Sequence, residues 1–71
     1  MVKISDKDAK DFAQIVRAKR TERGWSMQAL ADIAGIHKDT VYYLENCKHR
    51  PTRTIRELIC DALEIEDIWQ K

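Results

Sequence analysis

The last third of the chain carries a stripe of apolar residues at helical spacing. Between positions 55 and 63, apolar side chains recur at i, i+3, i+4, i+7 and i+8, at Ile55, Leu58, Ile59, Ala62 and Leu63. This spacing gives an α-helix one continuous apolar face, which other helices must cover. Only two glycines and one proline interrupt the 71 residues, which favours helices over a turn-rich β fold. The pattern predicts an all-α protein with a helix at about 53–63.

Capping residues and apolar spacing predict three further helices. A helix at about 6–23 begins after Ser5 and ends before Gly24, since glycine readily adopts the positive φ that closes many helices. Ser26 is a typical N-cap for a short helix at 27–34. His37 is expected to cap a third helix at 38–46, and Thr52 or Thr54 to cap the fourth. A short helical turn is expected at about 66–70.

The length of the chain leaves room for one small unit. Seventy-one residues are expected to form a single domain, 1–71, which argues against a typical enzyme. No run of about 18 apolar residues is present and the first residues lack the apolar centre of a signal peptide, so we expect a cytoplasmic protein without membrane contact. Cys47 and Cys60 form no regular framework, which predicts two free thiols rather than a disulfide.

Charge is unevenly distributed although the totals nearly cancel. The chain has 13 Lys and Arg against 12 Asp and Glu, but residues 37–56 hold five basic against two acidic side chains. Residues 57–71 hold one basic against five acidic side chains. A basic region beside an acidic tail steers association with polyanions, although charge alone fits an ordinary solvated face equally well.

Four small or apolar residues fall where two short helices would meet at a tight corner. Ala31 allows a close helix crossing, Gly35 can adopt the left-handed conformation that turns the chain, and Val41 and Leu44 would fill the space beneath the third helix. Together with this corner, the run at 24–36 (GWSMQALADIAGI) and the run at 44–51 (LENCKHRP) resemble the phage-repressor and Cro type of helix-turn-helix domain, the Xre family.

The resemblance implies a compact lambda-repressor-like domain of four to five helices that binds double-stranded DNA. Its third helix would enter the major groove, its second would cross the backbone, and the loop before its fourth would touch phosphates. It implies a small transcription regulator, which we expect to be a repressor. We further expect a homodimer on DNA that binds half-sites about 34 to 36 Å apart. It also implies an ion pair between Arg20 and Glu45.

Two residues depart from the family's pattern. Met27 stands where the family usually has a glutamine that helps to grip DNA, and Gln28 is a poor substitute for it. Cys47 stands where the family usually has glycine. Cys47 would therefore adopt an unfavourable backbone angle, or the turn would shift so that Asn46, which tolerates positive φ better, adopts it.

The outward positions of the third helix are the candidates for reading bases, namely Lys38, Asp39, Tyr42 and Tyr43. Lys38 suits guanine and Asp39 suits a cytosine amine, although a carboxylate in the first turn is also favoured by the helix dipole alone. The two tyrosines are about 100° apart around the helix, so one of them can pack against the body of the domain. Candidates for phosphate contacts are Ser26, Met27, Gln28, His37, Asn46, Lys48, Arg50 and Arg53. The alternative for Lys48, Arg50 and Arg53 is an ordinary solvated charge.

Other functions have less support in the sequence. A zinc site built from both cysteines and both histidines lacks a paired Cys-x-x-Cys spacing, and no phosphate loop or nucleophile motif is present, so we expect no metal, no cofactor and no enzyme. Cys47 beside Lys48 and His49 is a candidate redox switch on DNA binding. The alternative function is a module that acts mainly through a protein partner, such as an antitoxin. The candidates for a dimer interface, which could instead close the core, are Ile65, Ile68 and Trp69.

Overall fold

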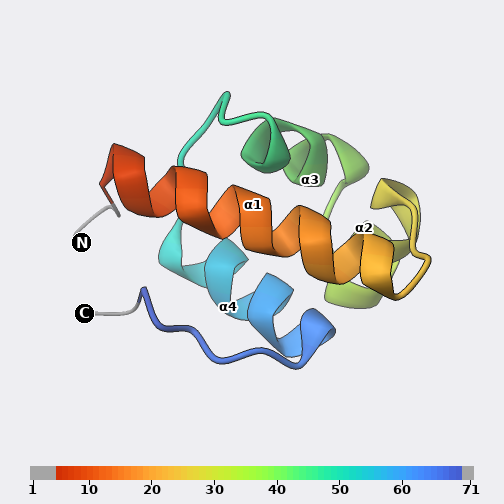
Figure 1. Cartoon of the computed structure of the whole chain (residues 1–71). Helices are drawn as coiled ribbons and strands as arrows, with labels where there is room; N and C mark the ends of the chain where they lie inside the picture. Colours follow the sequence, from red (N-terminus) through yellow and green to blue (C-terminus); the bar gives the residue numbers. More distant parts are fainter. Residues whose placement is uncertain (1–4, 70–71) are drawn as a thin grey trace.

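Four α-helices make up most of residues 5–69, the part of the chain that the computed structural model describes. They are α1 (Asp6–Glu22), α2 (Met27–Ala34), α3 (Lys38–Glu45) and α4 (Arg53–Leu63). In Figure 1, α1 lies across the front of the molecule, with α3 above it and α4 below it. Both α3 and α4 pack against α1 and α2. The predicted all-α fold is confirmed, and no helix within residues 5–69 is long and apolar enough to cross a membrane.

Each helix begins at a side chain that caps its first backbone amides. Ser5, Ser26 and Thr52 accept hydrogen bonds from the amides three residues further on, at 3.1, 3.0 and 3.2 Å. Nδ1 of His37 accepts a hydrogen bond from the amide of Asp39 at 3.0 Å. These oxygen and nitrogen acceptors satisfy amides that have no partner within the helix. The four predicted helix starts are therefore correct, and Thr52 rather than Thr54 caps α4.

Two of the predicted helix ends are one residue too long. The predicted helices at 6–23 and 38–46 end at Glu22 and Glu45. Arg23 caps α1 with a right-handed backbone, whereas Asn46 leaves helical geometry with a ψ of 10°, and the amides of both donate to carbonyl oxygens of the last turn. Gly24 follows Arg23 with a φ of 72°, as its sequence position predicts.

An apolar core fills the space between the four helices. The largest fully buried side chains come from all four of them and are Phe12, Val16, Leu30, Val41, Ile59 and Leu63. Ile59 and Leu63 belong to the apolar stripe of α4, and Ile55, Leu58 and Ala62 pack against the edge of the same core. The stripe at 55–63 therefore faces the core, as its spacing predicts.

Residues 64–69 leave α4 without forming the predicted helical turn at 66–70. Glu64 has φ 58° and ψ 42°, a left-handed conformation that ends α4. Arg23 donates to the carbonyl oxygen of Leu63 at this end, where a cation is favoured by the helix dipole. Beyond Glu64 the segment is irregular up to a turn at 68–69, and residue 70 lies outside the described residues. The helical prediction is wrong for 66–69 because the carboxylate of Asp67, not a helical carbonyl, accepts from the amide of Trp69, at 3.3 Å.

Trp69 closes the core. It is 6% exposed, and its ring meets Phe12 edge to face with the centroids 5.0 Å apart. Ile65 packs partly against the same core, whereas Ile68 is 65% exposed. Of the three residues predicted to form either an interface or the core, Trp69 and Ile65 contribute to the core and Ile68 stays on the surface.

Arg56 forms a buried ion pair with Asp67. Its Nε lies 3.2 Å from Oδ1 and 3.3 Å from Oδ2 of Asp67, and only 4% of the Arg56 side chain is exposed. A buried charge needs such a partner, because burial removes its hydration. Counting Arg56 among the surface charges of residues 37–56 is therefore wrong. Its charge is compensated by the segment that follows α4.

The two cysteines are expected to differ sharply in reactivity. Both are free thiols, and Cys47 is exposed whereas Cys60 is buried. Burial, and after it the carboxylate of Asp67, raises the pKa of Cys60 to about 11. Because the thiolate is the reactive form, a thiol reagent at about pH 8 should label Cys47 rapidly and Cys60 only as the protein unfolds. Mass spectrometry over time, with Cys47→Ser as a reference, measures this. Equal labelling rates would contradict the burial of Cys60.

Candidate nucleic-acid interface

The corner between α2 and α3 has the geometry that the sequence predicts. Gly35 has φ 75° and ψ 33°, and the amides of Gly35 and Ile36 both donate to the carbonyl oxygen of Ala31, at 2.8 and 2.9 Å. Ala31 and Val41 are fully buried, and Leu44 is 3% exposed. A Cβ on Gly35 would meet no atom within 4 Å, so the backbone conformation, not a lack of space, requires glycine here.

The expected ion pair between Arg20 and Glu45 is present at the end of α3. Nε of Arg20 donates to Oε2 of Glu45 at 2.7 Å, and Nη2 donates to Oε1 at 2.9 Å. Nη1 of Arg20 donates to the carbonyl oxygen of Trp25 at 2.8 Å, in the chain that leads into α2. The Glu45 side chain is fully buried. The hydrogen bond between Arg20 and Glu45 raises the pKa of Arg20 above the ordinary value, so the guanidinium remains charged.

Arg17 is a second cation at Glu45, in addition to the Arg20 that the resemblance implies. Its Nε lies 3.4 Å from Oε1 of Glu45, and 53% of its side chain is exposed. Arg17 precedes Arg20 by three residues on α1, so both project from one face of the helix. That spacing is the signal that could have identified it. Two guanidinium groups therefore surround one carboxylate.

The outward face of α3 consists of exposed polar and aromatic side chains. Lys38, Asp39, Tyr42 and Tyr43 are all exposed, whereas Val41 and Leu44 of the same helix are buried. The rings of the two tyrosines meet edge to face with centroids 5.6 Å apart. The face thus offers an ammonium, a carboxylate and two phenolic hydroxyls, which are donors and acceptors suited to base edges and phosphates.

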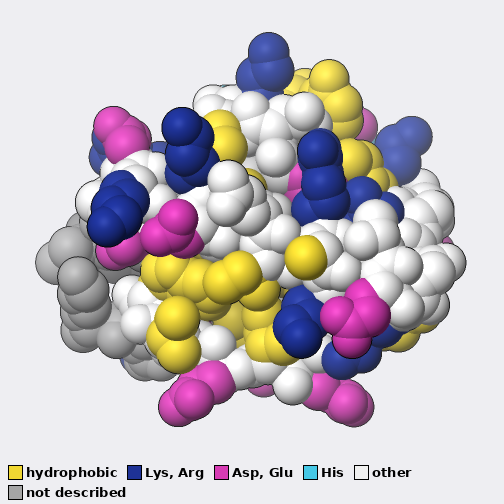
Figure 2. Space-filling view, in the orientation of Figure 1, with side chains coloured by type: hydrophobic (Ala, Val, Ile, Leu, Met, Phe, Trp, Pro, Cys, Tyr) yellow, Lys and Arg dark blue, Asp and Glu magenta, His cyan; other side chains and the backbone are white. Residues whose placement is uncertain are grey.

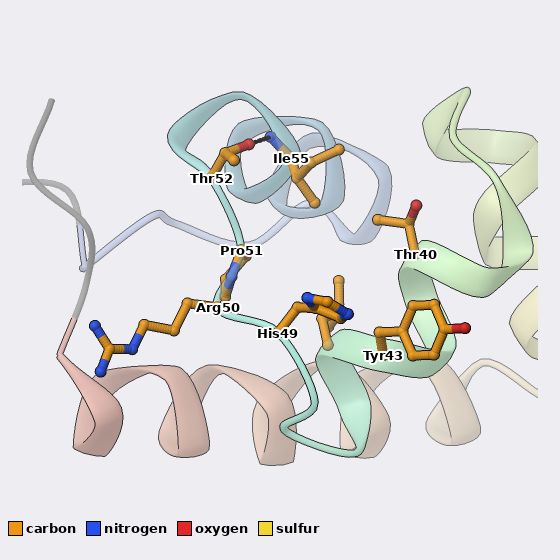
Figure 3. A pocket seen from close by; sticks show the side chains of 8 residues that line it. Thr40, Tyr43, His49, Arg50, Pro51, Thr52 and Ile55 are labelled. Carbon is orange, nitrogen blue, oxygen red and sulfur yellow. Dashed lines mark hydrogen bonds between the residues drawn. The ribbon is translucent and has the colours of Figure 1, made fainter.

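Tyr43 also contacts the loop that follows α3. Its ring centroid lies 5.0 Å from that of His49. Both residues line a hollow of about 270 Å³ between α3 and the start of α4. Figure 3 shows Thr40 and Tyr43 on the α3 side of this hollow and Thr52 and Ile55 on the α4 side. No local sequence pattern identifies the hollow, because the loop separates its two walls along the chain.

The candidates at the starts of α2 and α3 are largely engaged within the chain. Ser26 and His37 serve as caps, and His37 lies 3.8 Å from the carboxylate of Asp39. Nε2 of Gln28 donates to the side chain of Asp32 at 2.8 Å. Met27 is partly buried and packs against the core.

The basic side chains around the loop differ in their partners. Nε of Arg50 donates to the carboxylate of Asp6 at the start of α1, at 2.8 Å. Nε of Arg53 donates to the carboxylate of Glu57, one turn further along α4, at 3.0 Å. In Figure 3 the guanidinium of Arg50 points toward α1, away from the hollow. Lys38 and Lys48 have no carboxylate partner within the described part of the chain. Because Asp6 holds the guanidinium of Arg50, the structure does not bring that guanidinium to the face of α3.

Asn46 and Cys47 turn the chain out of α3. Asn46 has φ −98°, and its Nδ2 donates to the carbonyl oxygen of Tyr42 at 2.8 Å. Cys47 has φ 57°, so the first of the two predicted alternatives holds and the cysteine takes the left-handed conformation. No group of three His, Cys, Asp or Glu side chains among residues 5–69 is arranged to hold a metal ion.

Comparison with known proteins decides the family. A family model described as helix-turn-helix matches residues 16–70. This chain belongs to the Xre-type helix-turn-helix family of DNA-binding regulators. Among solved structures, the restriction-modification controller protein C.AhdI from Aeromonas hydrophila is similar, with a TM-score of 0.78 and 28% identity over 86% of this chain and 92% of that chain. No curated protein sequence matches significantly. Membership in this helix-turn-helix family points to a DNA-binding regulator and not to an enzyme.

Removal of Arg20 should destabilise the protein much more than removal of Arg17. Arg20→Ala leaves the buried carboxylate of Glu45 with one weak partner, and we expect it to lower the free energy of unfolding by about 3 kcal/mol. Arg17→Ala removes a half-exposed partner and should cost less than about 1 kcal/mol. Urea unfolding followed by circular dichroism measures both. Equal costs would mean that Arg20 is not the main partner of Glu45.

Replacement of Gly35 should reveal a purely conformational cost. Gly35→Ala adds a methyl group to open space but keeps the left-handed backbone, so the free energy of unfolding should fall by about 1 to 2 kcal/mol. Gly35→Asn should cost less, because asparagine tolerates this conformation better. Urea unfolding of the two variants tests the order. An alanine variant as stable as the parent chain would show that the corner has relaxed.

Proposed function

We propose that this chain binds specific sequences of double-stranded DNA as a small transcription regulator, with α3 in the major groove. The observation that carries the proposal is the division of α3 into two sides. Val41 and Leu44 are buried, whereas Lys38, Asp39 and Tyr42 are exposed to solvent. Membership in the Xre-type family and the similarity to a restriction-modification controller protein support a role in the control of transcription.

Base reading is assigned to the first turns of α3. Lys38 would donate to O6 and N7 of guanine, and Asp39 would accept from a cytosine amine. Tyr42 and Tyr43 would contact thymine methyl groups or phosphates, with Tyr43 oriented by its contact with His49. The carboxylate of Asp39 also lies at the start of a helix, where the dipole favours it, so its base contact adds to a local structural role.

Phosphate binding is assigned to the groups on either side of α3. Lys48 would neutralise a phosphate, and the backbone amides of Ser26, Met27 and Gln28 would donate to another from the start of α2. Side-chain contacts from His37, Asn46 and Arg53 would add to these. Arg50 contributes only after it leaves Asp6, with which it is paired in the free protein.

We further propose that the protein represses transcription and binds as a homodimer. A protein that occupies promoter DNA excludes competing proteins from it without any further activity. Ile68, 65% exposed in the segment after α4, offers an apolar contact to a second copy. A symmetric dimer would read an inverted repeat with half-sites about 34 to 36 Å apart.

Selection of fragments from a random duplex library tests the proposed function. At about 150 mM salt nonspecific phosphate binding is weakened, so enriched fragments report base reading. We expect an inverted repeat with half-sites about one helical turn apart. Enrichment of no sequence would overturn the proposal and favour the alternative, a module that acts through a protein partner.

Two lysine variants should separate base reading from phosphate binding. Lys38→Ala should relax the preference at one base position, at a cost of about 1 to 3 kcal/mol for the preferred sequence. Lys48→Ala should weaken binding to all sequences alike. Fluorescence anisotropy with the selected site and single-base variants measures both effects. An unchanged preference in Lys38→Ala would remove Lys38 from the base-reading set.

A further inference from the structure

We infer that α1 carries an additional phosphate-binding site, in the hollow between α1 and the end of α3, and that a phosphodiester of bound DNA occupies it. The inference rests on the proposed function and extends the contact surface beyond α2, α3 and the loop. It assigns Lys10 and Arg17 as the residues that bind this phosphate.

The hollow lies along one face of α1. It has a volume of about 190 Å³ and is lined by Lys10, Ala13, Gln14, Arg17, Glu45 and Cys47. Lys10, Gln14 and Arg17 are four and three residues apart, so they project from the same face of α1. Lys10 and Cys47 also border a neighbouring hollow of about 210 Å³, which reaches Asp6 and Arg50. Figure 2 shows Lys and Arg side chains along the edge of α1 that faces α3.

The charges in this region leave a cationic surplus. Both oxygens of Glu45 already accept hydrogen bonds from Arg20, at 2.7 and 2.9 Å. Arg17 therefore adds a positive charge that the buried carboxylate does not need. The carboxylate of the neighbouring hollow, Asp6, is paired with Arg50. Lys10 has no carboxylate partner among residues 5–69.

The side chains have the donors that an anion requires. Arg17 directs Nε toward Glu45 at 3.4 Å, while 53% of its side chain is exposed to solvent. A guanidinium donates through several N–H groups in a fixed fork, so the remaining donors of Arg17 can bind a second, external anion. The ammonium of Lys10 and the amide of Gln14 supply further donors on the same face. A phosphodiester suits this site because it is an anion with acceptor oxygens.

Continuity with the loop favours a phosphate of DNA over a free anion. Cys47 lines the hollow, and its neighbours Asn46 and Lys48 belong to the proposed phosphate-binding surface. A strand that contacts the loop at Asn46 and Lys48 therefore passes the mouth of the hollow beside Cys47. Long side chains at Lys10 and Arg17 would then meet the next part of the same backbone.

Charge-removing variants with a matched control test this site. Lys10→Gln and Arg17→Gln each remove one positive charge from the hollow. Lys19→Gln removes the same charge from the same helix, but position 19 is about 200° around the helix from position 17 and its Nζ lies 3.9 Å from Glu22. Binding to the selected duplex and to an unrelated duplex is measured by anisotropy between about 50 and 200 mM salt.

We expect each hollow variant to weaken binding to both duplexes by about five-fold at about 0.1 M salt, and to reduce the slope of log K against log salt by about 1. The control should change neither the slope nor the affinity by more than about two-fold, because exposed distant charges are screened. Slopes in Lys10→Gln and Arg17→Gln that equal that of the control would overturn the inference. Thermal unfolding of each variant verifies that it is folded.

A second measurement shows whether the hollow binds DNA or a free anion. Together with the salt dependence, it also separates a failure of this inference from a failure of the proposed function. The Nε–H signal of Arg17 in NMR spectra should shift on addition of duplex and not on addition of inorganic phosphate at equal ionic strength. A shift with inorganic phosphate alone would overturn the assignment to DNA. Sequence-specific binding that is unaffected by the hollow variants rejects only the α1 site. Reduced slopes without any sequence preference reject the proposed function and retain the site.

Discussion

The orientation of α3 depends on the bond between Arg20 and Glu45. A helix of eight residues is too short to be stable alone, so its position must come from its contacts. Glu45 fixes one end of α3 to α1, and the same guanidinium bonds the chain at Trp25 that leads into α2. One side chain thus sets the relative positions of three helices. The outward face of α3 can be rigid because its anchor, the Glu45 side chain, is fully buried.

Internal pairing explains how a chain with nearly balanced charge can offer a cationic surface. Arg50, Arg53 and Arg56 each pair with a carboxylate, so their positive charges are compensated. A count of charged residues in the sequence treats the same charges as free. Lys38 and Lys48, which have no carboxylate partner among residues 5–69, lie on α3 and on the loop that follows it. Local charge, not net charge, therefore governs how this protein approaches a polyanion.

The sequence predicts those features that depend on neighbours along the chain. The helix starts follow from caps only two or three residues away, and the α2–α3 corner follows from Gly35 and the apolar residues around it. The predicted helical turn does not form at residues 66–69, because the pair of Arg56 and Asp67 and the left-handed Glu64 redirect the segment. The pair of Arg50 and Asp6 joins residues 44 positions apart, so no local pattern reveals it. Lys38, Asp39, Tyr42 and Tyr43 could be placed outside the core from spacing alone, whereas their contacts with bases depend on a partner molecule.

The pairing of Arg56 with Asp67 has a consequence for how the protein opens. If residues 64–69 frayed independently, they would leave the buried guanidinium of Arg56 without its partner and uncover Phe12, against which the ring of Trp69 packs. Both events cost free energy that terminal segments do not ordinarily require. The segment is thereby joined to the cooperative unit of the core. Its amides should exchange with solvent through global unfolding rather than local fluctuation, and the fluorescence of Trp69 should follow the loss of the whole fold.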